Sequence, residues 1–238
     1  MARKMQEWLG LSPADRSACI LPIYYNAGFK ATLLVPLLMG CSVALPATTN
    51  SQEFDQWVAE LRPTWLTAAP AFLQAVLERI RAVGKPAHAL RFVLSTASYL
   101  SEGVRTELER LLDIPVVEFY GLCEAGMMTA PPLPPAEPRH GTVGRVPKDE
   151  LAIRGDRQLH LPPGQVGQVV LRGPSVTPGY LLDIDGAPSG LENGWLPTGR
   201  DAAGARGSDA PSYHGGRRQG GAHHPSAFRD HGRQCRCP

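Results

Sequence analysis

The chain has 238 residues, of which 43% are hydrophobic and 19% are charged, and its formal net charge is +2. This length allows a substantial core in one large domain or two small ones, and the charge is too small to indicate nucleic acid as a partner. The five cysteines are scattered without metal-ligand spacing, which indicates reduced thiols in a cytoplasmic protein. The longest apolar stretch is too short for a membrane span.

Strand-like and helix-like segments alternate between residues 41 and 119. Short apolar runs predict strands, and apolar residues at helical spacing predict the helices between them. The strands are expected at 41–46, 64–70, 90–96 and 115–121, and the helices at 51–63, 71–84 and 101–113. Ser51 and Ser101 are the expected N-caps, and Gly84 is an expected C-cap. Short connections between these elements predict right-handed βαβ units and a parallel sheet covered on both faces.

The composition changes after this α/β part. A Pro-rich linker is followed by short segments divided by Gly and Pro, which predict a small, mostly antiparallel β module. From about residue 200 the chain has few Val, Ile or Leu and many Gly, Arg and His, so a disordered tail is expected. The predicted organisation is an α/β subdomain at 1–130, a small β subdomain at 131–199 and a disordered tail at 200–238.

Two loops at the ends of predicted strands carry the first candidate site. In open parallel sheets, ligands bind beyond the carboxyl ends of the strands. Small residues at 95–100 let a flat ligand approach the backbone, and Tyr120 can stack on a planar ring. Gly121 permits a sharp turn, and Glu124 can bind Mg²⁺, which usually arrives with phosphates. These residues indicate a nucleotide site, although a strand end with a surface Glu and a half-buried Tyr is the alternative.

Six segments in order resemble the adenylate-forming enzyme superfamily, which includes acyl-CoA synthetases, luciferases and peptide-synthetase adenylation domains. The segments are LPIYYNAG (21–28), LRFVLSTASYL (90–100), EFYGLCEAG (118–126), GTVGR (141–145), GQVGQVVLRGPSVTPGY (164–180) and NGWLPTG (193–199). The resemblance covers roughly residues 1–200. Residues 128–144 are most similar to the small-acid or fatty acid–CoA ligase branch.

The segment YGLCE resembles the Tyr-Gly-x-Thr-Glu motif of that family. The resemblance implies that Tyr120 packs near adenine and that Glu124 is the catalytic residue that binds the magnesium of ATP. It also places Gly121, Leu122 and Cys123 in the nucleotide site. Cys123 stands where the family usually has Thr, whose hydroxyl contacts phosphate, and a thiol is a weak donor.

Two further segments complete the expected nucleotide site. Thr96, Ala97 and Ser98 match the loop that lines the adenine and acyl pockets, and tight packing of small residues is the alternative there. The family has Thr-Gly-Asp near residue 200, with an Asp that holds the ribose hydroxyls. Here Arg200 occupies the Asp position, and Asp201 follows one residue later as the candidate for that contact.

The segment LPIYYNAG resembles the wall of the acyl pocket. The resemblance implies that Tyr25, Asn26 and Gly28 line this pocket, with Tyr25 at a position where the family often has His. The implied reaction joins a small-molecule carboxylic acid to AMP from ATP, with Mg²⁺, and then to a thiol, usually coenzyme A.

The resemblance also implies what the chain lacks. The family's phosphate loop would precede residue 1, and the small C-terminal domain with its catalytic lysine is not found. We therefore expect a piece from the middle of the large domain, inactive by itself. The alternative is a non-catalytic acyl- or nucleotide-binding or interaction module that pairs with a separately encoded N-terminal half. A dehydrogenase-like protein is a third possibility, but no G-x-G-x-x-G follows a strand.

The tail suggests a change of reading frame. Read one nucleotide later, codons allowed for residues 203–208 can spell Leu-Glu-Pro-Glu-Gly, and those for 222–226 can spell Arg-Ile-Ile-Arg. Both resemble family segments that follow Thr-Gly-Asp. We therefore hypothesise a frameshift near residues 199–203; the rival hypothesis is a genuine His- and Arg-rich tail.

Overall fold

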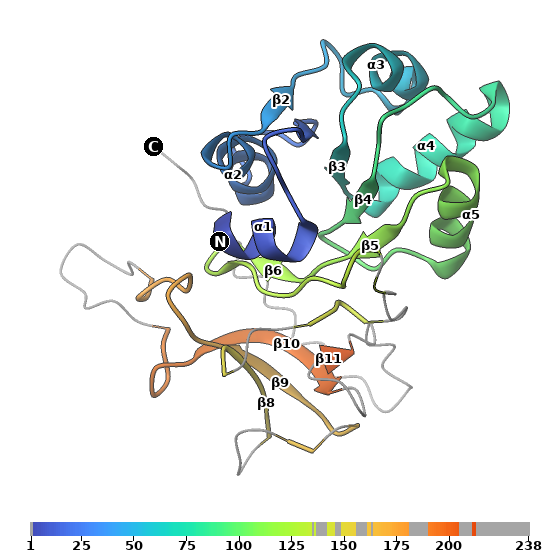
Figure 1. The fold of residues 1–238 in the computed structure, drawn as a ribbon. Helices are drawn as coiled ribbons and strands as arrows, with labels where there is room; N and C mark the ends of the chain where they lie inside the picture. The colour runs from blue at the N-terminus through green and yellow to red at the C-terminus, as the bar shows by residue number, and fades with distance from the viewer. Residues whose placement is uncertain are drawn as a thin grey trace.

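The computed structural model describes residues 2–134, 136, 142–145, 149–155, 161–162, 164–180, 190–204 and 211–212. They form a parallel α/β region and a smaller antiparallel sheet, which lie at the top and bottom of Figure 1. This arrangement confirms the fold class predicted from the sequence. None of the helices in the described part of the chain is long and apolar enough to cross a membrane.

A five-stranded, entirely parallel sheet forms the centre of the α/β region, with strand order β2-β1-β3-β4-β5. Its strands are β1 (Arg16–Ala18), β2 (Ser42–Ala44), β3 (Trp65–Ala68), β4 (Phe92–Ser95) and β5 (Val116–Glu118). Four of them were predicted. Strand β1 was not, because three residues that include Arg and Ser give no strand pattern, yet it lies between β2 and β3.

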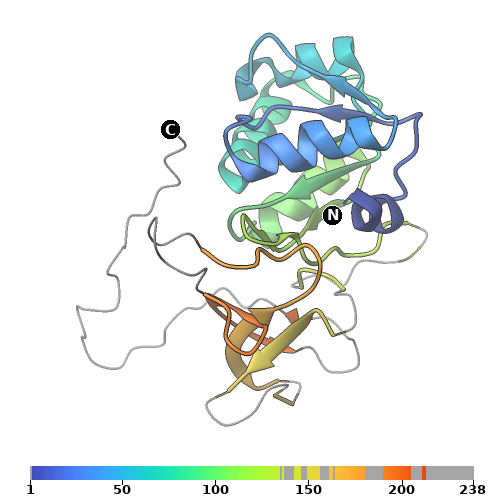
Figure 2. The ribbon, with the colours of Figure 1, turned by 90° about the vertical axis from the view of Figure 1, so that its left-hand side faces the viewer.

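Helical elements cover both faces of this sheet, as expected for buried parallel strands. They are α1 (Ala2–Leu9), the π-helix η1 (Ala27–Leu34), α2 (Val35–Leu38), the 3₁₀-helix η2 (Ser51–Glu53), α3 (Phe54–Leu61), α4 (Pro70–Val83) and α5 (Glu102–Leu112). One apolar core joins α3, α4 and α5 to one face, and a second joins α1, η1 and α2 to the other. Figure 2 shows α1 and α4 on opposite sides of the strands.

The helix ends confirm two of the three predicted caps. The Ser101 hydroxyl accepts a hydrogen bond from Val104 N at 3.4 Å, and Gly84 ends α4 with φ of 91°. The prediction of Ser51 as an N-cap was wrong. Asn50 caps the turn instead, because its Oδ1 accepts from Gln52 N at 3.0 Å. Both side chains suit an N-cap, and only the backbone geometry chooses between them.

A four-stranded antiparallel sheet with order β11-β10-β9-β8 forms the smaller region. Its strands are β8 (Leu151–Arg154), β9 (Val166–Leu171), β10 (Leu196–Gly204) and β11 (Pro211–Ser212). A short hairpin of β6 (Gly121–Leu122) and β7 (Gly126–Met127) follows β5. Ala130 and Arg145 form an isolated antiparallel bridge beside it.

Strand β10 continues through residue 204 and pairs with β11, so it crosses the predicted start of the tail at residue 200. The other residues of 200–238 lie outside the described part of the chain. The domain boundaries at 130 and 199 stay predictions.

Candidate functional site

A cavity of about 410 Å³ lies at the carboxyl ends of β4 and β5. It is lined by residues 95–99 and 118–122, together with Val143 and Arg200. The two strands are neighbours in register, with Ser95 opposite Glu118, so the loops that follow them emerge side by side. The cavity therefore has the location that the strand pattern predicts for a ligand site.

Six of the predicted nucleotide-site residues line this one cavity. The loop after β4 contributes Thr96, Ala97 and Ser98, and the segment after β5 contributes Tyr120, Gly121 and Leu122. The structure thus brings together residues about 25 positions apart in the sequence. Their individual roles toward a ligand stay predictions.

The loop after β4 turns sharply at Ala97. Thr96 N still donates to Ala68 O at 3.1 Å, which continues the parallel ladder. Ala97 then has φ of 78°, in the left-handed region that an L side chain rarely adopts. Backbone strain of this kind clusters at functional sites, and it aims the following residues into the cavity wall.

Hydrogen bonds within the segment after β5 fix its conformation. Tyr120 N donates to Thr129 Oγ1 at 2.9 Å, while Met128 N and Thr129 N both donate to Tyr120 O. A Cβ at Gly121 would lie 2.5 Å from Gly126 O, so the β6–β7 hairpin requires glycine there. The glycine at position 121 is therefore required by the close approach of two backbone segments, whether or not a ligand binds beside it.

Glu124 and Cys123 are not among the residues that line the cavity. Glu124 Oε1 accepts a hydrogen bond from the Tyr180 hydroxyl at 3.0 Å, and Glu124 O accepts from Thr177 N at 2.7 Å. Cys123 is exposed. Sequence reasoning missed Tyr180 as a partner of the carboxylate. The signal was available, because residues 177–180 end one of the segments that resemble the family.

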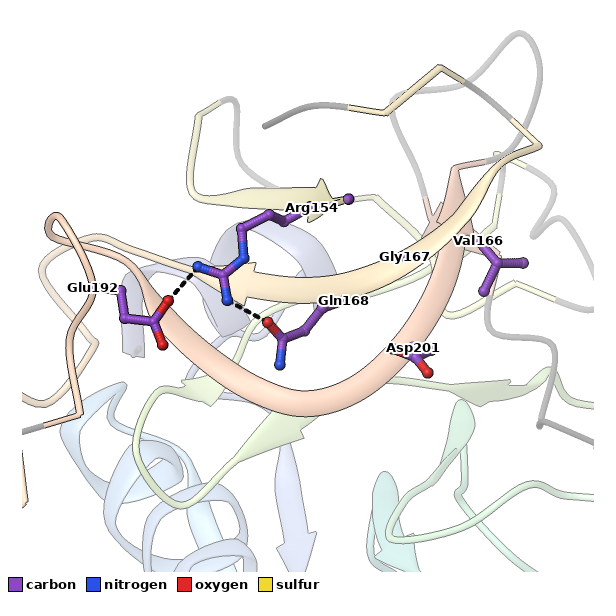
Figure 3. Close-up of a pocket in the computed structure, with 7 residues that line it drawn as sticks. Arg154, Val166, Gly167, Gln168, Glu192 and Asp201 are labelled. Atoms are coloured by element: carbon purple, nitrogen blue, oxygen red, sulfur yellow. Dashed lines mark hydrogen bonds and ion pairs between the residues drawn. The ribbon is translucent and has the colours of Figure 1, made fainter. Parts of the chain in front are cut away.

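Arg200 and Asp201 lie on different sides of β10. Gly199 has φ of 65°, and the pairing with β9 is irregular between Pro197 and Asp201, which marks a β-bulge. Successive strand residues point to opposite faces, so Arg200 lines the cavity and Asp201 does not. Asp201 lies instead at a second pocket on the antiparallel sheet (Figure 3). The structure therefore does not bring Asp201 together with the other nucleotide candidates.

The predicted acyl-pocket residues lie just outside the cavity lining. Asn26 Nδ2 donates to Leu122 O at 3.4 Å, which ties this segment to the cavity wall. The Tyr25 ring is 59% exposed and lies 4.6 Å from the Tyr24 ring. A Cβ at Gly28 would lie 2.2 Å from Pro22 O, so packing alone requires glycine there.

The buried edge of the cavity also holds a carboxyl group that sequence reasoning did not single out. Burial raises the pKa of Glu118, while a hydrogen bond from Leu100 N and the charge of Arg105 partly oppose this rise. Leu100 N lies 2.6 Å from Glu118 Oε1. The hydrogen bond fixes the carboxyl group at the end of β5, opposite Ser95.

Glu124 can serve as a magnesium ligand only with help from a substrate. Among the described residues, no group of three or more His, Cys, Asp or Glu side chains could hold a metal ion. Mg²⁺ bound to nucleotide phosphates needs only one or two protein carboxylates. A carboxylate has two acceptor oxygens, so the hydrogen bond from Tyr180 to Oε1 does not prevent Glu124 from binding an ion. The residues present therefore fit Mg²⁺ that is carried by phosphates.

A family model described as AMP-binding enzyme matches residues 1–181. The chain belongs to the AMP-binding enzyme family. Among curated members, it is 32% identical over 194 residues to an oxalate–CoA ligase of Arabidopsis thaliana, which covers 79% of this chain and 38% of that protein. It is 33% identical over 200 residues to a sulfoacetate–CoA ligase of Cupriavidus necator, with 82% and 39% covered.

Two solved structures of other proteins have the same fold. ATP-bound MatB from Rhodopseudomonas palustris superposes with a TM-score of 0.76 at 21% identity, over 89% of this chain and 42% of that one. An anthranilate CoA ligase in complex with anthranoyl-AMP gives a TM-score of 0.74 at 20% identity, over 87% and 40%. The chain thus spans about two fifths of the length of these proteins.

Proposed function

We propose that this chain forms one wall of the adenylate site of an ATP-dependent acid–CoA ligase. The observation that carries the proposal is the shared cavity: residues 96–98 and 120–122 come from separate loops and meet at the carboxyl ends of β4 and β5. The family membership and the curated CoA ligases support it. Two of the curated relatives are CoA ligases of oxalate and of sulfoacetate, and on that basis we propose a small carboxylic acid as the substrate class.

The proposed reaction has two steps, formation of an acyl-adenylate and transfer of the acyl group to coenzyme A. A carboxylate oxygen of the acid bonds to the α-phosphorus of ATP, and pyrophosphate leaves. The sulfur of coenzyme A then attacks the acyl carbonyl, the thiol loses its proton and AMP leaves. Mg²⁺ neutralises phosphate charge when it is bound, with Glu124 as its protein ligand. The Tyr180 hydroxyl holds the Glu124 carboxylate in place, and the Tyr120 ring packs near adenine.

We further propose that the chain by itself binds an adenylate but turns it over poorly. Among the described residues that line the cavity, Arg200 is the only cation, and no lysine lies there. Stabilising a departing phosphate depends on oriented donors and cations, and loss of one such donor typically costs ~10²-fold to ~10³-fold in rate. Addition of the acid and ATP is therefore expected to release no measurable pyrophosphate.

Binding of a stable acyl-sulfamoyl-adenosine analogue, measured by calorimetry, tests the proposal. Tyr120→Ala removes the predicted stacking partner and should weaken binding by roughly 5-fold to 150-fold, the range for one base on an aromatic ring. Tyr24→Ala is the matched control, because that ring is 78% exposed and does not line the cavity. No binding by the unaltered chain, or equal loss in both variants, would contradict the proposal.

One observation supports a second function, an interaction module that pairs with a separately encoded half. Leu37 and Leu38 on α2 are 54% and 62% exposed, and β2 beside them is an edge strand of the sheet. Exposed apolar patches and free strand edges mark association surfaces. Co-purification with a protein encoded upstream would test this, since Leu37→Glu should weaken the association and an unchanged association would argue against this surface. A cytoplasmic location remains a proposal, supported by the free thiols of Cys19 and Cys41.

A further inference from the structure

Arg200 gives the cavity its only positive charge among the described lining residues. It comes from β10 of the antiparallel sheet, while most of the lining comes from the loops after β4 and β5. Glu118 is the only acid in the described lining, and its Oε1 already accepts a hydrogen bond from Leu100 N. The cavity lining therefore contains the hydrogen-bonded carboxyl group of Glu118 and the guanidinium group of Arg200.

The guanidinium of Arg200 has no ion-pair or hydrogen-bond partner in the described part of the chain. Only its backbone N takes part in a hydrogen bond with a described residue, donating to Thr198 Oγ1 at 3.2 Å. A guanidinium carries five N–H donors in a fixed planar arrangement. All five are therefore available to a ligand in the cavity.

Arg154 shows what an arginine with a structural role looks like in the same sheet. Figure 3 shows its side chain between Glu192 and Gln168. Its Nη1 lies 2.5 Å from Glu192 Oε2, and its Nη2 lies 2.5 Å from Gln168 Oε1. The charge of Arg154 is thus neutralised within the protein, whereas that of Arg200 is not.

A second unused donor lies in the wall of the same cavity. Ser95 is fully buried at the end of β4, and its hydroxyl has no hydrogen-bond partner among the described residues. A buried polar group without a partner is uncommon and calls for an explanation, which a ligand acceptor would supply. Arg200 and Ser95 both favour a ligand that is rich in acceptor oxygens.

We propose that Arg200 binds a phosphate group of the nucleotide in this cavity. The planar guanidinium matches phosphate oxygens with two parallel hydrogen bonds, and the charge assists both. The inference rests on the proposed function, and it adds a phosphate contact at the position where the resembled family motif has an acid. It also makes this chain select the phosphorylated nucleotide over the nucleoside.

Calorimetric titration of AMP and of adenosine tests this selectivity. The unaltered chain should bind AMP more tightly than adenosine. Arg200→Gln should lower the affinity for AMP about tenfold, which is the lower end of the range for a hydrogen bond to a charged group, and should leave the affinity for adenosine unchanged. Arg200→Lys should retain part of the preference. Arg110→Gln is the matched control, since Arg110 is exposed on α5 and does not line the cavity.

The outcomes separate this inference from the proposed function. An equal loss for AMP and adenosine, or no loss for either, would show that Arg200 does not contact phosphate. If the unaltered chain binds neither ligand, the proposed function fails, and the anion contact is then decided by titrating pyrophosphate. A shift of the Arg200 Nε–H resonance in nuclear magnetic resonance spectra would support an anion site, and an unchanged resonance would overturn it.

Discussion

The two sheets of this protein build their cores in different ways. The parallel sheet has an apolar core on each face, formed mainly by its own strands and by helices packed against them. The core of the antiparallel sheet contains Ala125 and Met128 from the segment after β5, with Tyr120 and Leu122 packed against it. The smaller sheet therefore depends on the same segment that lines the candidate site.

Polar contacts tie the two regions at other points. Thr177 N donates to Glu124 O, and an ion pair joins Lys4 on α1 to Glu150 just before β8. Figures 1 and 2 both show the smaller sheet below the carboxyl-terminal edge of the parallel one. The parallel sheet therefore positions the site, while the antiparallel sheet holds one of its loops in place.

Leucine truncations in the two cores should have the largest effects on stability. They also test whether the candidate site depends on the smaller sheet. Leu73 lies in the α4-side core, and Leu171 lies in the core of the antiparallel sheet. Leu73→Ala and Leu171→Ala should each lower the free energy of unfolding by about 2–5 kcal/mol, measured by urea denaturation. Only Leu171→Ala should also weaken binding of the adenylate analogue under conditions where both variants are folded. Equal binding by both variants would contradict the dependence of the site on the smaller sheet.

Removing the Tyr180 hydroxyl should have the next largest effect. Tyr180→Phe deletes the hydrogen bond to Glu124, and such bonds to a charged group contribute about 1.5–3 kcal/mol. Because Glu124 is partly exposed, a loss near the lower end is expected in thermal or urea unfolding. The variant should also lower the effect of Mg²⁺ on nucleotide binding. Tyr24→Phe is the control, since Tyr24 is 78% exposed and does not line the cavity, and an equal loss there would argue against a specific role for Tyr180.

Substitution by glycine should have opposite effects on stability in the strained loop after β4 and in the regular helix α4. Ala97 has φ of 78°, so Ala97→Gly should raise stability by about 1 kcal/mol through relief of backbone strain. Ala75→Gly in the middle of α4 is the matched control and should lower stability by about 1 kcal/mol. The two changes should shift the melting temperature in opposite directions. A decrease for both would mean that the loop carries no such strain.

The smallest effect should come from the titration of Glu118. Burial raises its folded-state pKa above the ordinary value of 4.5. The folded state then binds more protons than the unfolded state between these two pKa values, so stability should fall as pH rises through that window. Glu118→Gln can keep the hydrogen bond from Leu100 N and should remove this dependence. Urea unfolding of both forms between pH 4 and pH 7 would show it, and parallel pH profiles would contradict it.

Much of the fold could be predicted from local patterns. The four predicted strands and three predicted helices of the α/β region all exist, because apolar spacing and the caps at Gly84 and Ser101 are local signals. The π-helix η1 and strand β1 were not predicted. Their stabilisation comes from burial against distant elements, which single-segment patterns do not contain. The hypothesis of a frameshift near residues 199–203 stays a prediction, which the nucleotide sequence across codons 195–215 would test.

Local sequence patterns were sufficient to predict which loops meet at the site. Residues 95–100 and 118–122 follow neighbouring parallel strands, and the geometry of such strands brings their ends together without any further information. The side chains from distant segments that contact these loops could be identified only from the three-dimensional structure. Tyr180 reaches Glu124 across 56 positions, and a bulge at Gly199 turns Arg200, and not Asp201, toward the cavity. Contacts between distant segments depend on which strands pair and on the face of the sheet to which each side chain points. Neither can be predicted from a local sequence pattern.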